Sequence, residues 1–129
     1  MPISVKGVIL ANDAVVLLKN ERNEWELPGG RLESGELHTA CCARELSEEL
    51  GIAATVIELI DTWVYNIGSS CVQIVTYACL VESSQLSETR LSHEHKALGV
   101  FPLLSLGDLV IPDGYVRSIK TWAKQWRRM

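Results

Sequence analysis

The sequence lacks the features that mark secreted, membrane-spanning or zinc-stabilised proteins. Its four cysteines form no CxxC pair, so we expect no structural zinc site. No apolar run approaches the roughly 18 residues needed to span a bilayer. The first residues also lack the basic and apolar segments of a secretion signal. We therefore expect a cytoplasmic protein with free thiols and no membrane partner.

The sequence also lacks a strong excess of charge. The formal net charge is −4, whereas a nucleic-acid-binding protein normally has a dominant basic surface. A chain of 129 residues is long enough to bury a core without disulfides. We therefore expect residues 1–129 to form one globular domain that does not bind nucleic acid.

The first part of the chain has the pattern of a β-hairpin. Val5–Ala11 and Ala14–Lys19 are apolar and rich in β-branched residues, and Asn12-Asp13 separates them. Such runs around a short polar turn predict two antiparallel strands. Later, Ala53–Asn66 and Cys71–Glu82 predict two longer strands.

Two helices are predicted on either side of these long strands. His38–Leu50 has an apolar stripe and ends at Gly51, a residue that commonly terminates helices. A second amphipathic helix follows Pro112. Between them we expect a polar loop, Ser83–Lys96, and a short strand, Phe101–Leu104. Together these elements predict an α/β (α+β) fold with a mixed sheet between helices.

Three glutamates gather on the first helix. Glu45, Glu48 and Glu49 stand at positions i, i+3 and i+4, so they share one helix face. Like charges at this spacing destabilise a helix unless a cation offsets them. Carboxylate oxygens are preferred ligands of Mg²⁺, which also binds substrate phosphates. The pattern therefore predicts a Mg²⁺ site, with Mn²⁺ as a substitute.

The segment from Gly30 to Ile52, GRLESGELHTACCARELSEELGI, resembles the Nudix box at every defined position. That pattern is G-x5-E-x7-REUxEExGU, where U is an aliphatic residue. The preceding Leu27-Pro28-Gly29-Gly30 is similar to the usual lead-in of the family. The resemblance implies a Nudix-like α/β/α sandwich and hydrolysis of a diphosphate bond.

The resemblance also implies roles for individual residues. Glu45, Glu48, Glu49 and the Gly29 carbonyl are expected to bind the metal, and Arg44 is expected to pair with Glu36 and position the loop against the helix. The general base is left open between Glu45 and Glu94, the latter within Ser92–Lys96.

Candidates for substrate binding are less specific. Trp25, Arg31 and Tyr65 lie near the predicted site in sequence or on a neighbouring strand. Aromatic side chains stack well on bases, but packing in the core is the better single explanation for Trp25 and for Tyr65.

The resulting hypothesis is a metal-dependent hydrolase that cleaves the diphosphate bond of a nucleoside diphosphate linked to another moiety. Its small-molecule partner is a nucleotide, and family habit makes a homodimer plausible. The alternative is a nucleotide-binding or sensing module that keeps the fold without turnover. The sequence does not identify the nucleotide or the linked moiety.

Overall fold

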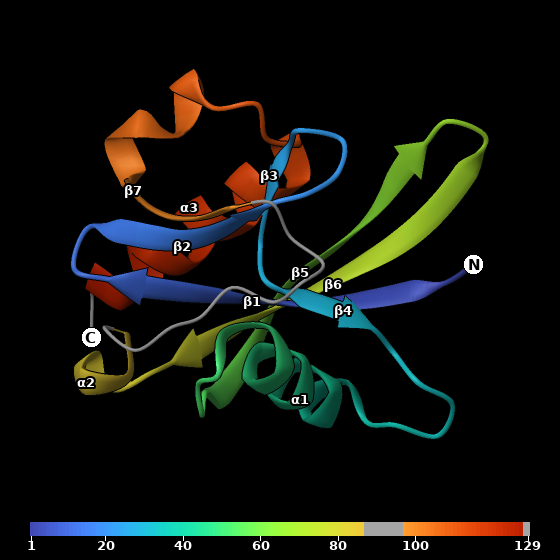
Figure 1. Ribbon diagram of the computed structural model, residues 1–129, viewed down its shortest axis with the longest axis horizontal. Helices are drawn as coiled ribbons and strands as arrows, with labels where there is room; N and C mark the ends of the chain where they lie inside the picture. The colour runs from blue at the N-terminus through green and yellow to red at the C-terminus, as the bar shows by residue number, and fades with distance from the viewer. Residues whose placement is uncertain (87–96, 128–129) are drawn as a thin grey trace.

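The computed structural model describes residues 1–86 and 97–127, which form a mixed β-sheet with helices on both faces (Figure 1). In chain order the elements are β1 (Ile3–Ala11), β2 (Ala14–Lys19), β3 (Trp25–Glu26), β4 (Gly29–Arg31), α1 (His38–Leu50), β5 (Thr55–Ile67), β6 (Ser70–Leu80), α2 (Ser83–Leu86), β7 (Ala97–Pro102), the 3-10 helix η1 (Leu103–Asp108) and α3 (Asp113–Arg127).

The strand order is β3-β2-β1-β6-β5, with β4 also paired to β1 and β7 to β2. Only the β1–β6 pairing is parallel; the other described pairings are antiparallel. The β5–β6 hairpin extends away from the rest of the sheet (Figure 1). This arrangement confirms the predicted mixed sheet between helices.

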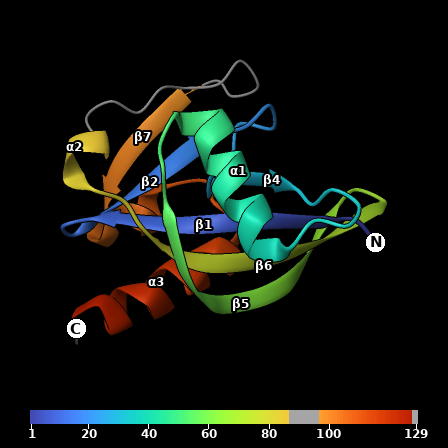
Figure 2. The ribbon, with the colours of Figure 1, turned by 90° about the horizontal axis from the view of Figure 1, so that it is seen from below.

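Alternating residues of the central strands supply two hydrophobic cores, one packed against α1 and the other against α3. On one face Val5 and Ile9 pack with Leu46 and Leu50 of α1. On the other face Val8 and Leu10 belong to the cluster that contains α3. Because successive residues of a strand point to opposite faces, β1 serves both cores. Figure 2 shows α1 and α3 on opposite sides of the strands.

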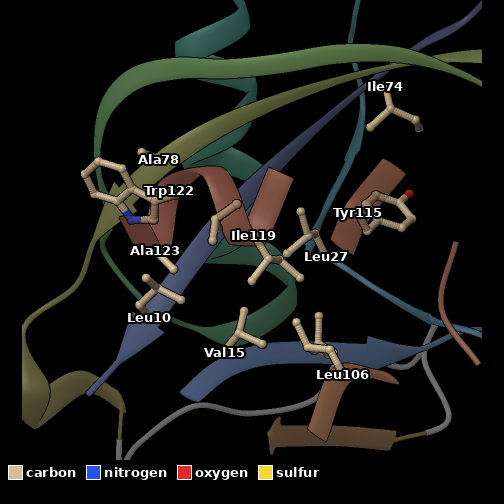
Figure 3. Close-up of a cluster of buried hydrophobic side chains, with 12 residues drawn as sticks. Leu10, Val15, Leu27, Ile74, Ala78, Leu106, Tyr115, Ile119, Trp122 and Ala123 are labelled. Atoms are coloured by element: carbon tan, nitrogen blue, oxygen red, sulfur yellow. The ribbon is translucent and has the colours of Figure 1, made fainter. Parts of the chain in front are cut away.

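The core on the α3 side is built around Tyr115, Ile119 and Trp122, which are almost fully buried. Figure 3 shows Ile119 between Leu27 and Val15, with Trp122 at the Ala78 end of the cluster and Tyr115 at the Ile74 end. The predicted helical stripe therefore faces the sheet as expected. One end of this core, at Tyr115 and Ile74, continues into the cavity described below.

Several predicted boundaries are confirmed and others are wrong. Helix α1 occupies the predicted range and ends at Gly51, whose φ is 69°. The predicted strand Phe101–Leu104 is shifted, because β7 begins at Ala97 and ends at Pro102, and η1 follows it. Part of the predicted loop Ser83–Lys96 is the short helix α2, and residues 87–96 lie outside the described part of the chain.

Candidate active site

The segment of residues 27–30, called the glycine turn here, leads from β3 into β4 and is held closely against both β1 and α1. Gly29 has a φ of 144°, and a Cβ at this position would overlap the carbonyl oxygen of Val5. A Cβ on Gly30 would overlap the carboxylate of Glu45. No other residue fits such close approaches without displacing its neighbours. The two glycines therefore allow α1 to present its acidic face at the turn.

Glu49 links the acidic helix to this turn by a direct hydrogen bond. The backbone N–H of Gly29 donates to Oε1 of Glu49 at 2.6 Å. Glu49 is 4% exposed, which is unusual for a carboxylate unless it is paired or hydrogen-bonded. The contact fixes the position of Glu49 relative to β4.

Arg44 joins the loop that precedes α1 to two glutamates of the helix. Its Nε and Nη2 donate to the two carboxylate oxygens of Glu36 at 2.7 and 3.0 Å. Its Nη1 donates to Glu45 at 3.0 Å and to Glu48 at 3.2 Å. The guanidinium also donates to the carbonyl of Arg31 at 3.3 Å. Arg44 thus positions the loop and orients Glu45 at the same time.

These contacts change the protonation behaviour of the acidic side chains. The guanidinium of Arg44 lowers the pKa of Glu36 to about 2. Burial raises the pKa of Glu45, although its bond to Arg44 opposes the shift. The site therefore contains one glutamate with a lowered pKa and one with a raised pKa, and both accept hydrogen bonds from the same arginine.

A cavity of about 470 Å³ opens beside the turn, and the acidic helix forms only part of its wall. Its charged and amide side chains come from three strands, one loop and α1: Lys6, Asn20, Glu21, Arg22, Glu26, Arg31, Glu45 and Glu49. The β5–β6 hairpin and α3 add a mostly apolar wall: Tyr65, Ile67, Val72, Ile74 and Tyr115. A cavity of this size, with a polar wall and an apolar wall, suits a small organic ligand that has both polar and apolar parts.

A second charged cluster lies in this cavity. Lys6 Nζ contacts Glu26 Oε2 at 3.2 Å, and both side chains are nearly buried. The amide of Asn20 donates to the other oxygen of Glu26 at 2.6 Å. Beside them, Tyr65 donates its hydroxyl proton to Glu24 at 2.6 Å. Arg22 lies over the Tyr65 ring, with its guanidinium carbon 5.9 Å from the ring centroid.

The structure brings most of the predicted site residues to the cavity. Gly29, Arg31, Glu45, Glu49 and Tyr65 line it. The backbone of Arg31 also accepts the bond from Arg44 described above. Their proposed roles stay predictions, because geometry alone assigns no activity.

Other predicted residues lie elsewhere. Glu48 does not line the cavity; its side chain is 60% exposed and contacts Arg44. Trp25 packs edge-on against Phe101, with ring centroids 4.6 Å apart, and it does not line the cavity either. Glu94 lies outside the described residues.

The charged and amide residues of the cavity that sequence reasoning missed are Lys6, Asn20, Glu21, Arg22 and Glu26. One signal was present, because Lys6 is the only charged residue within the apolar run of β1. A lysine inside a buried strand needs a partner. The identity of that partner depends on the pairing of β1 with distant parts of the chain.

The residues present suit a hard divalent cation that shares its ligands with a substrate. In the described ranges, 1–86 and 97–127, no three His, Cys, Asp or Glu side chains are grouped so as to hold a metal ion. Glu45 and Glu49 nevertheless line the same cavity beside the glycine turn. Mg²⁺ is commonly bound by one or two carboxylates together with waters and phosphate oxygens. The donor set therefore fits such an ion.

A family model for the NUDIX domain matches residues 1–122 of this chain. The chain belongs to the Nudix family. Nudix proteins generally use divalent metal ions such as Mg²⁺. The match covers the glycine turn, the acidic helix and the cavity residues, and it confirms the family predicted from the Gly30–Ile52 motif.

Curated relatives share part of the sequence. The CTP pyrophosphohydrolase of Escherichia coli K12 is 29% identical over 102 residues, covering 74% of this chain and 73% of that protein. The 8-oxo-dGTP diphosphatase of Proteus vulgaris is 32% identical over 66 residues, covering 51% of this chain and 59% of that protein. Two Mycobacterium tuberculosis relatives are 42% identical over 55 residues, and the chain spans 39% of their length.

Solved structures share the fold. A C. elegans Ap4A hydrolase, solved as a binary complex, has a TM-score of 0.86 at 18% identity, with 100% of both chains covered. A MutT protein from Methanosarcina mazei Go1 has a TM-score of 0.79 at 24% identity, covering 96% of this chain and 94% of its own. The chain therefore has the Nudix fold. In the described part of the chain, no helix combines the length and apolar character needed to cross a membrane.

Proposed function

We propose that the protein hydrolyses the diphosphate bond of a nucleoside diphosphate linked to another moiety, such as a nucleoside triphosphate or a nucleotide sugar. The observation that carries the proposal is a cavity that combines Glu45 and Glu49 with the basic side chains of Arg22 and Arg31. Phosphates need cationic partners and an acidic metal platform, and a nucleoside needs the apolar wall beside them. Relatives named as pyrophosphohydrolases and diphosphatases support the same reaction class.

The proposed cofactor is Mg²⁺, with Mn²⁺ as a substitute. Glu45, Glu49 and the carbonyl of Gly29 would hold it, and Glu48, which contacts Arg44 in this structure, is the proposed additional ligand. When bound, the ion neutralises phosphate charge and lowers the pKa of a water molecule. Without it, the glutamates and the phosphates would repel one another.

The chain's own residues would then position the reactants. We propose that water adds its oxygen to one phosphorus, the bridging P–O bond breaks, and a carboxylate accepts the proton of the water. Glu45 is the described candidate for this base, because Arg44 orients it and it faces the cavity. Glu94 remains the alternative base. Arg44 acts as a positioning residue, since it contacts the loop and the glutamates rather than the cavity.

The experiment that tests this proposal is product analysis. The purified protein is incubated with Mg²⁺ and a panel of nucleoside triphosphates, dinucleoside polyphosphates and nucleotide sugars, and the products are separated by anion-exchange chromatography. We expect a nucleoside monophosphate from at least one substrate. Release of inorganic phosphate alone would contradict the proposed bond. Saturable nucleotide binding without any product would instead support the non-catalytic binding module.

We further propose that residues 1–129 act as one Nudix domain on small nucleotides in the cytoplasm. The four cysteines are free in the structure, which agrees with a reducing compartment. A homodimer remains part of the proposal. Light scattering coupled to size-exclusion chromatography tests it directly, and a mass of one chain would exclude a stable dimer.

A further inference from the structure

The buried ion pair between Lys6 and Glu26 is not explained by the hydrolytic chemistry. The side chains are 7% and 11% exposed. Removing two charges from water costs free energy that their mutual attraction often does not recover. In proteins generally, well-packed apolar residues of similar volume often stabilise a fold as well as a buried ion pair does. The presence of charges at the wall of a ligand cavity therefore points to recognition of a ligand.

Lys6 has hydrogen-bonding capacity beyond this pair. A lysine ammonium has three N–H donors, and among the described residues its side chain donates one hydrogen bond, to Glu26. The carboxylate of Glu26 lies 3.2 Å from the ammonium and favours its charged form. The side chain therefore stays charged at neutral pH. It presents a cationic donor to the cavity.

The position of Lys6 places this donor next to the metal platform. On β1, Lys6 is paired in register with Gly29 of β4, the residue whose N–H binds Glu49. Another part of the cavity wall is the largely apolar surface of the β5–β6 hairpin, where Tyr65 and Val72 are paired in register. Because the polar and apolar walls belong to one cavity, it suits a ligand with an apolar face and a polar edge, such as a nucleobase.

We infer that the Lys6–Glu26 pair reads the edge of a keto base, in which a carbonyl oxygen stands beside a ring N–H. Guanine and uracil have this edge, and adenine has no carbonyl. Lys6 donates to the carbonyl oxygen, while Glu26 accepts from the ring N–H and is held in place by Asn20. This inference rests on the proposed function, because it assigns a substrate class to the same cavity.

The chemistry of the pair favours this edge over that of adenine. A hydrogen bond from a charged ammonium to an exocyclic oxygen is charge-assisted, and so is the bond from a ring N–H to a carboxylate. Adenine presents a donor at its exocyclic position and an acceptor in its ring. Against adenine, the donor Lys6 would therefore meet the exocyclic N–H donor, and the acceptor Glu26 would meet the ring-nitrogen acceptor.

The test compares equilibrium binding of GMP and AMP by calorimetry, and hydrolysis of GTP and ATP with Mg²⁺, in three proteins. They are the wild type, the double variant Lys6→Met/Glu26→Gln, and the control Lys120→Met on the exposed face of α3. The double variant removes both charges of the pair together, and the introduced amide still offers a partner to Asn20. Circular dichroism verifies that each variant is folded.

We expect the wild type to bind GMP more tightly than AMP. In the double variant, binding of GMP should weaken roughly tenfold to hundredfold, the loss expected for hydrogen bonds to charged groups, while AMP binding stays the same. The ratio of kcat/KM for GTP and ATP should fall in parallel. Lys120→Met should change neither.

Equal weakening of GMP and AMP would overturn the inference, because it would indicate a contact with phosphate. An unchanged GMP preference, or no GMP binding by the wild type, would overturn it as well. Failure of the proposed function is distinguishable from these results. A wild type that binds GMP over AMP without cleaving any nucleotide refutes the hydrolysis and leaves the base-reading pair intact.

Discussion

Two charged clusters meet at the cavity, and they are built from different parts of the chain. The cluster around Arg44 joins α1 to the segment directly before it. Of its hydrogen bonds, the one between the residues farthest apart in the sequence joins Arg44 to Arg31, 13 positions away. The cluster around Glu26 joins β1, β3 and the connecting loop, and Lys6 lies 20 positions from its partner. The first cluster is partly exposed and the second is buried. The cluster around Arg44 is thus encoded by one continuous stretch of sequence. The cluster around Glu26 forms only when the strands of the sheet come together.

The largest effect is expected from breaking the buried cluster. Lys6→Met leaves the carboxylate of Glu26 buried with Asn20 and Arg22 as neighbours, and breaking such a pair costs about 3–5 kcal/mol. Urea denaturation should show this loss in the free energy of unfolding. Lys6→Met/Glu26→Gln should recover most of it.

The matched control for this prediction is Glu21→Gln, which breaks an exposed pair with Arg22. Exposed pairs contribute about 0–1 kcal/mol, so this variant should unfold at nearly the wild-type urea concentration. If Lys6→Met and Glu21→Gln lowered the free energy of unfolding equally, the buried pair would contribute no more to stability than an exposed pair.

The next effect concerns the acidic helix. Glu49→Gln removes a carboxylate that lines the cavity and accepts from Gly29, and we expect kcat to fall at least about 10²-fold, as for loss of a major electrostatic contributor. Steady-state kinetics on the best substrate of the panel measure this loss. Glu58→Gln, on the exposed part of β5, is the control and should retain full activity. A Glu49→Gln enzyme with wild-type kcat would remove Glu49 from the mechanism.

The smallest effect is a pH dependence within the Arg44 cluster. The pKa of Glu36 is lowered from 4.5 to about 2, so its ion pair stabilises the folded state above pH 4.5. That stabilisation is lost progressively as the pH falls from 4.5 toward 2, because the unfolded state binds the proton first. Glu36→Gln should therefore lower the Tm at pH 7 and approach the wild type in acid.

Thermal unfolding of the two proteins between about pH 7 and pH 3 measures this convergence, since the window spans most of the titration of Glu36. A Tm difference that stays constant over the whole range would show that the carboxylate of Glu36 does not stabilise the fold through its charge.

The same comparison explains how much the sequence could predict. Helix α1 was predicted with its observed bounds because its apolar stripe and Gly51 are local signals. The pairing of Arg44 with Glu36 was predicted within one motif. By contrast, β7 begins earlier than predicted because it pairs with β2 from Ala14 to Lys19, and no pattern within 97–102 records that pairing.

The side chains near the cavity also show where prediction from the sequence fails. Trp25 was predicted near the site because it precedes the glycine turn, but its ring packs on Phe101 of β7. Tyr65 reaches the cavity, where it donates to Glu24 across 41 positions of the chain. Neither outcome follows from spacing, because each depends on which strands become neighbours. Sequence therefore predicts the reaction platform better than the pocket beside it.

The most direct test of the central claim is the rate of nucleoside monophosphate release as a function of Mg²⁺ concentration. The protein is first freed of metal with a chelator, and the rate is then measured with the best substrate of the panel. We predict no turnover without metal and a saturable rise as Mg²⁺ is added, with Mn²⁺ able to replace it. An undiminished rate in excess chelator would contradict the account that Glu45 and Glu49 form a metal platform for hydrolysis.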